Sequence, residues 1–179
     1  APVYTKSGLN NGPNKFGFDA PYYGIALDSA NDRLFVADMA NTRVVVYNLN
    51  ADDTLIDRIA DSVLGQPNLY TGTSATTQAG LASGPYGLAL DTSTNRLFVS
   101  NGQRVTVYDV AAVTNGENAI NVLGQTNFTN NNSATTQSGL TWPRGLHYSN
   151  NRLYVSQNSG SRIMIFDVTA ITNGENAVD

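Results

Sequence analysis

The side chains that could perform chemistry are few and scattered along this 179-residue chain. His147 is the only histidine, and cysteine is absent. A single imidazole cannot build a multi-histidine metal site, and a chain without thiols has neither disulfides nor thiolate ligands. Asp28 and Asp91 each precede a turn containing Ser, Thr or Asn, where a carboxylate commonly caps the turn backbone. We therefore assign no catalytic residue, no metal ligand and no cofactor.

Three arginines, Arg33, Arg96 and Arg152, recur at equivalent places before short apolar runs. Their repetition favours structural ion pairs or packing of the aliphatic stem over catalysis. No Ser-His-Asp arrangement, Gly-rich phosphate loop or pair of catalytic carboxylates is recognisable. The sequence therefore shows no catalytic arrangement, and the positions of these residues depend on the secondary-structure elements that carry them.

A segment of apolar runs and turns occurs three times, starting at Pro21, Pro85 and Pro143, with a period of roughly 60 residues. In the middle copy the runs are Gly87–Asp91, Arg96–Ser100 and Arg104–Asp109, and a Val-Leu-Gly-Gln run follows. Val, Ile, Leu, Phe and Tyr dominate these runs, which predicts short strands. The Asn101-Gly102 pair predicts a two-residue type I′ hairpin with positive φ at both residues.

The residues within the third run of each copy indicate how the sheets are stacked. Val44–Tyr47 and Ile163–Phe166 are apolar without interruption, whereas a strand with one wet face alternates. Sheets buried on both faces need a layer on each side, as in a β-propeller. We predict an all-β propeller of three four-stranded blades, at residues 21–66, 85–125 and 143–179, in a single domain. Residues 1–20 are expected to form a leading loop and strand that complete a neighbouring blade.

The composition excludes several classes of partner. Charged residues make up 13% of the chain, the net charge is −4, and no basic run is present. A phosphate backbone therefore has little to bind, and we expect no nucleic-acid partner. No apolar stretch is long enough to span a membrane, so we expect no membrane partner. The compartment is unknown, although a first residue that is Ala fits a processed, secreted or periplasmic chain.

The repeated units P-x-G-[IL]-A-L-D, N-x-R-L-F-V-A-D and N-x-R-V-x-V-Y resemble the NHL repeat, and the NGENA and VLGQ blocks resemble a bacterial long-repeat type. The third copy departs from this pattern, with Leu146-His147-Tyr148-Ser149 in place of Leu-Ala-Leu-Asp. The resemblance implies a six-bladed ring, of which this chain supplies half. It also implies a platform for binding, although some similar propellers are metal-dependent lactonases or lyases.

Positions that break the repeat are the best candidates for a ligand site. We predict that the P-x-G motif forms a turn that leads into each innermost strand. The residue inside this turn changes from Tyr22 in the first copy to Tyr86 and then Arg144, where a ring or guanidinium could hold a small molecule or peptide at the channel rim. Asn101 and His147 complete the set of rim candidates. For His147, packing between blades is the favoured alternative.

The two ends of the sequence resemble parts of one outer strand. Pro2, Val3 and Tyr4 stand where a VLGQ block is expected, and Ala177 and Val178 match the residues that precede such a block. We therefore predict a homodimer that closes a six-bladed ring, with these residues at the junction. A metal-dependent lactonase- or lyase-like enzyme and a piece of a longer propeller are the alternatives.

Overall fold

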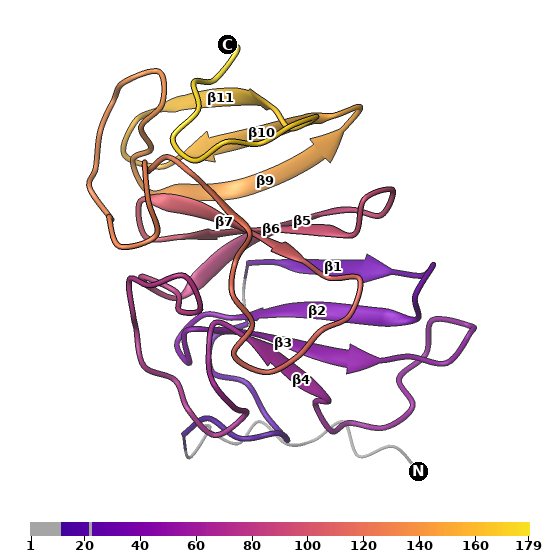
Figure 1. Cartoon of the computed structure of the whole chain (residues 1–179). Coiled ribbons are helices and arrows are strands. Elements are labelled where there is room, and N and C mark those ends of the chain that lie inside the picture. Colours follow the sequence, from indigo (N-terminus) through magenta and orange to yellow (C-terminus); the bar gives the residue numbers. More distant parts are fainter. Residues whose placement is uncertain (1–11, 22) are drawn as a thin grey trace.

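Three antiparallel sheets lie in a row in the computed structural model, which describes residues 12–21 and 23–179 (Figure 1). Within these ranges no helix is long and apolar enough to cross a bilayer. The strands are β1 (Ile25–Asp28), β2 (Arg33–Asp38), β3 (Arg43–Asn48), β4 (Ser62–Leu64), β5 (Pro85–Asp91), β6 (Arg96–Asn101), β7 (Arg104–Asp109), β8 (Asn121–Leu123), β9 (Pro143–Ser149), β10 (Arg152–Gln157) and β11 (Arg162–Asp167). Each sheet is a meander in chain order, so each is one blade of a propeller.

The third blade has three strands. The last residues of the chain pair with β11, in the place of a fourth strand. The Val178 amide donates to the Ile165 carbonyl over 2.7 Å, and the Ile165 amide donates to the Asp179 carbonyl over 2.8 Å. In the second blade, the equivalent amide of Ile120 donates to Val107 over 2.7 Å. All three blades therefore follow the predicted four-row pattern.

The core consists of apolar layers between neighbouring blades. Phe35 of the first blade packs in one cluster with Leu97 and Tyr108 of the second. Phe98, on the other side of the second blade, packs in another cluster with Phe166 of the third. The middle blade is thus buried on both faces, as expected for a propeller blade between two neighbours.

Two local predictions for the second blade were wrong. The P-x-G motif is no turn, because β5 already begins at Pro85, with an irregular register between Pro85 and Leu88. Asn101 is the last residue of β6 and is not among the residues with positive φ, so the loop consists of Gly102, with φ of 60°, and Gln103. The Asn101 side chain is buried, and its Oδ1 accepts hydrogen bonds from the Ala82 amide and Arg104, which explains why it stays in the strand.

The prediction of two-sided burial holds for one of the two apolar rows. Val44–Tyr47 are all buried. Along β11, by contrast, Met164 and Phe166 are buried, whereas Ile163 is exposed and Ile165 is partly exposed. The third blade therefore presents an apolar face that nothing in the described chain covers.

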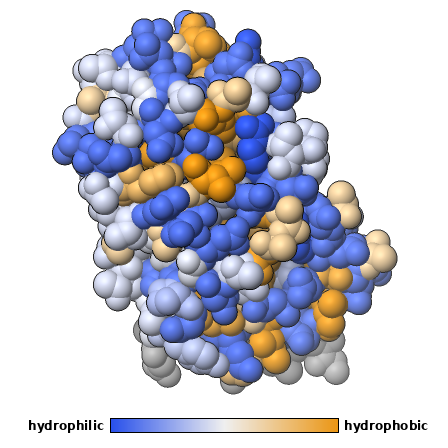
Figure 2. All heavy atoms as spheres, in the orientation of Figure 1, coloured by the Kyte–Doolittle hydropathy of each residue, from blue (hydrophilic) through white to orange (hydrophobic). Residues whose placement is uncertain are grey.

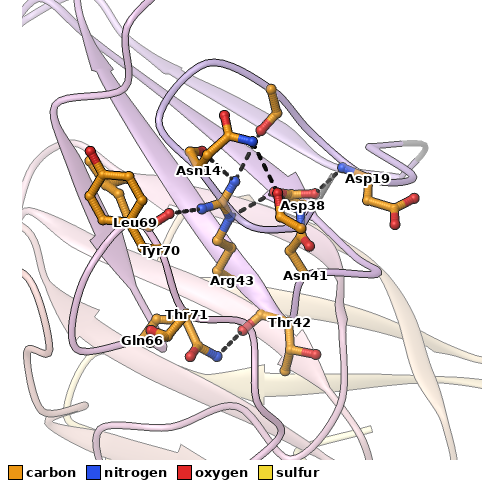
Figure 3. A network of polar contacts seen from close by, with 12 residues as sticks. Asn14, Asp19, Asp38, Asn41, Thr42, Arg43, Gln66, Leu69, Tyr70 and Thr71 are labelled. Carbon is orange, nitrogen blue, oxygen red and sulfur yellow. Dashed lines mark hydrogen bonds and ion pairs between the residues drawn. The ribbon is translucent and has the colours of Figure 1, made fainter. Parts of the chain in front are cut away.

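An arginine at the start of each third strand donates hydrogen bonds to carbonyls of the long loops. Figure 3 shows the network around the first of them, Arg43. Arg43 and Asp38 form a fully buried ion pair of 2.7 Å, and Arg43 also donates to the carbonyls of Asn14, Gly17 and Leu69. Arg104 binds the carbonyls of Thr77, Gly80 and Phe128 in the same way. These loops thus have a defined conformation, because buried carbonyls need donors.

The carboxylates at the ends of the innermost strands form hydrogen bonds within the turns that follow, as expected. Asp28 pairs with Arg33 over 2.7 Å and accepts two hydrogen bonds from Asn31. Asp91 pairs with Arg96 over 2.8 Å and accepts hydrogen bonds from the Ser93 and Thr94 hydroxyls. In the third blade, Arg152 pairs instead with Asp167 over 2.7 Å. The repeated arginines are therefore structural.

Candidate functional site

The innermost strands β1, β5 and β9 lie next to one another in sequence order (Figure 1). They line an open trough. The trough has a volume of about 240 Å³, and its lining comes from equivalent positions: Ile25–Leu27, Leu88–Leu90 and Leu146–Tyr148. In a closed propeller this wall would face the central channel. The residues two positions before each lining segment lie at one end of the trough, which would be one mouth of that channel.

A row of aromatic and cationic side chains stands at this mouth. The rings of Tyr23 and Tyr86 meet edge to face, with centroids 5.1 Å apart. The Arg144 guanidinium carbon lies 3.5 Å from the Tyr86 centroid and 5.5 Å from the Trp142 ring. We call these four residues, Tyr23, Tyr86, Arg144 and Trp142, the mouth row. They come from all three blades, so the fold brings together residues that are far apart in sequence.

Two of the predicted rim residues, Tyr86 and Arg144, are members of the mouth row. Tyr22 lies outside the described residues. Tyr23, its neighbour, takes the corresponding place and is exposed. Trp142 was missed by sequence reasoning, although it is the only tryptophan and directly precedes the third repeat's proline.

The backbone of Trp142 is held in an unusual conformation. Its φ is +49°, a region that bulky residues rarely adopt. The Trp142 amide donates to Gln103 Oε1 over 2.7 Å, and its carbonyl accepts from the Asn158 amide over 3.0 Å. These bonds to the second and third blades fix the backbone of this exposed residue, and strained residues of this kind cluster at functional sites.

The other two rim candidates lie elsewhere. The Asn101 side chain is buried, and its amide nitrogen donates to the Val99 carbonyl and the Thr106 hydroxyl, so it supports the fold. His147 is exposed on the uncovered face of the third blade, 6.1 Å from the Tyr154 ring. It is therefore not packed between two blades of this chain, because only one of its sides has a neighbouring blade.

Only part of the predicted dimer junction is described. Pro2, Val3 and Tyr4 lie outside the described residues. Ala177 is buried in the core of the third blade, and Val178 is exposed. Ile120, which corresponds to Val178 in the second blade, is exposed as well, so the exposure of Val178 does not by itself indicate a missing neighbour.

The outer face of the first blade carries an apolar groove of about 480 Å³. Its lining includes Leu34, Val36 and Tyr47 of the sheet, and Phe18 and Leu55 from flanking loops. The Phe18 ring packs 5.9 Å from that of Tyr47, and burial raises the pKa of the Tyr47 hydroxyl to about 12. In the described part of the chain, no group of three or more His, Cys, Asp or Glu side chains could hold a metal ion.

Comparison with known proteins identifies the fold. No protein-family model matches the chain, and no curated protein sequence matches it. Among solved structures, hydrazine synthase from Kuenenia stuttgartiensis aligns over 99% of this chain and 39% of the other, with 14% identity and a TM-score of 0.56. The WD40 β-propeller domain of Doa1 aligns over 93% and 44%, with 11% identity and a TM-score of 0.51.

The β-propeller domain of Cps50 (Swd1) from Myceliophteria thermophila aligns over 90% of this chain and 37% of the other, with 10% identity and a TM-score of 0.50. The chain thus spans less than half the length of these structures. Similarity at this level of identity establishes the architecture and not the activity. Together with the three stacked antiparallel sheets, it shows that the chain has the fold of a partial β-propeller.

Proposed function

We propose that this chain is a binding module of the NHL-like type, and that two copies join head to tail into a six-bladed ring. Three blades of the described chain cover half of such a ring, and the mouth row would then border a closed channel. The observation that carries the proposal is a pair of apolar faces, one at each end of the row of blades. These faces correspond to the two sides of the blade interfaces inside the chain.

The trailing face, formed by His147, Tyr154, Ile163 and Ile165 of the third blade, is equivalent to a buried face of the second blade. Ile163 is 67% exposed, whereas Val105 at the equivalent position is 0% exposed. Tyr154 is 37% exposed, whereas Phe98 is 0% exposed. These side chains therefore stand where the fold elsewhere places a neighbouring blade.

The leading face is formed by Ile25, Leu27, Leu34, Val36 and Tyr47 of the first blade. It is only partly open, because flanking loops bury Val36 and Tyr47, whereas Ile25 and Leu27 are exposed. Ile25 is 70% exposed, whereas Leu88 at the equivalent position is 7% exposed. The apolar groove lies on this face, and the space-filling view shows apolar patches within a mainly hydrophilic surface (Figure 2). Covering a few hundred Å² on each face contributes several kcal/mol at ~25 cal/mol per Å².

An aspartate on the trailing face provides the direct test of this proposal. Ile163→Asp places a charge where an apolar interface is proposed, so we expect a dimeric wild type and a monomeric, folded variant in light scattering. Ile120→Asp is the matched control, because Ile120 is exposed although both sides of its blade are covered. Equal masses for the wild type and Ile163→Asp would contradict the proposal, provided that circular dichroism shows both proteins folded.

A further inference from the structure

We propose that the mouth row binds a small planar carboxylate, with Arg144 holding the carboxylate and Trp142 packing against the flat body. This inference rests on the proposed function as a binding module and specifies the ligand of its mouth. All four residues belong to one chain, so the site itself does not depend on ring closure.

Arg144 differs from six other arginines in what its guanidinium contacts. In those six, the guanidinium forms an ion pair of 2.7–2.8 Å with an aspartate or donates to loop carbonyls, as shown by Arg33, Arg43, Arg96, Arg104, Arg152 and Arg162. In the described part of the chain, the Arg144 guanidinium has ring contacts and neither an ion pair nor a hydrogen bond. Its donors therefore remain available.

The ring contacts determine which part of Arg144 is available. At 3.5 Å from the ring centroid, the guanidinium carbon lies directly against Tyr86, which is itself buried. A guanidinium that stacks through its face keeps its N–H groups along the edge, where they match the two oxygens of a carboxylate. The stacked ring also limits the conformations of this long side chain, so less entropy is lost when a ligand binds.

Trp142 provides the apolar part of the site. Its ring is exposed, lies 5.5 Å from the guanidinium carbon, and belongs to a residue whose backbone both neighbouring blades fix. An exposed indole on a fixed backbone offers a flat surface for an aromatic ligand. A carboxylate attached to a planar ring therefore fits both Arg144 and Trp142, whereas a neutral ring leaves the Arg144 guanidinium without a counter-ion.

Benzoate and its neutral isostere benzamide test this inference, because Trp142 is the only tryptophan and reports from within the site. We expect benzoate to change the Trp142 fluorescence saturably, with a dissociation constant on the order of 1 mM for a ligand of this size. Benzamide should bind at least about tenfold more weakly, because it cannot form the charge-assisted pair. Arg144→Gln should remove this preference for benzoate, and Arg144→Lys should retain part of it.

Arg152→Gln is the matched control, since Arg152 pairs with Asp167 and lies outside the mouth row. It should bind benzoate as the wild type does. Absence of a saturable change at tenfold higher benzoate, or equal affinities for benzoate and benzamide, would overturn the inference. Light scattering on the same samples keeps the two proposals apart: a monomer that binds benzoate contradicts only ring closure, and a dimer that does not bind it contradicts only the ligand assignment.

Discussion

At Asp91, burial and hydrogen bonding act on one carboxylate in opposite directions. Burial raises its pKa, but the hydrogen bonds from Ser93, Thr94 and Arg96 outweigh burial, so the pKa lies well below its ordinary value. A carboxylate with a lowered pKa in the folded state stabilises the fold above its unfolded pKa of about 3.9. That contribution is lost as the pH falls from there toward the folded pKa.

We therefore predict that Asp91→Asn lowers the free energy of unfolding at pH 7 and reduces its dependence on pH below about pH 4. Urea unfolding followed by circular dichroism between pH 7 and pH 3 measures both effects. If the wild type and the variant lose stability in parallel below pH 4, the ionised form of Asp91 has no special role in the turn.

The residues of the mouth row show how far sequence reasoning reaches at this scale. Tyr86 and Arg144 could be identified because they interrupt a repeat. Trp142 could not, since its place beside Arg144 depends on a strained backbone held by Gln103 from the preceding blade. Asn101 was misplaced because an Asn-Gly pair predicts a turn, whereas the buried hydrogen bonds to Ala82 and Thr106 that retain Asn101 in β6 leave no sign in the sequence pattern.

Among the elements, the loops that follow the third strands link each blade to the one before it. Asn115 Oδ1, in the loop of the second blade, accepts a hydrogen bond of 2.9 Å from the Val63 amide of the first. Asn173 does the same for Val122. The NGENA blocks, which sequence analysis could only recognise as a repeat, thus join adjacent blades.

Asn115→Ala should leave the Val63 amide without its acceptor, because Val63 is fully buried. We expect a loss of about 1–3 kcal/mol in the free energy that protects this amide, seen as faster hydrogen exchange at Val63. Asn127→Ala is the control, since Asn127 accepts hydrogen bonds only within its own loop, from Thr129. Unchanged protection of Val63 would show that the loop is held by other contacts.

For the molecule as a whole, the sequence predicted the architecture because the repeat, the strand pattern and the turns agree with one another. The sequence could not distinguish an apolar strand that is buried on both sides from one that is exposed on one side. Val44–Tyr47 and Ile163–Phe166 look alike in composition, yet only the first is fully covered. Loop residues cover the outward side of Val45 and Tyr47 on the first blade, whereas Ile163 on the third blade stays exposed.

His147 is the polar exception on the trailing face, where the other blades have Ala26 and Ala89. Burying an imidazole without a dedicated partner disfavours association. We predict that His147→Ala tightens the proposed dimer by about tenfold, equivalent to ~1.4 kcal/mol. Sedimentation equilibrium compares the two dissociation constants, and weaker association of the variant would mean that His147 contributes a favourable contact.

The mass of the wild-type protein in solution tests ring closure most directly. Light scattering at micromolar concentration should give twice the chain mass of 19.1 kDa, because the trailing face and the open part of the leading face would otherwise remain exposed together. A stable, folded monomer of 19.1 kDa at that concentration would contradict the account.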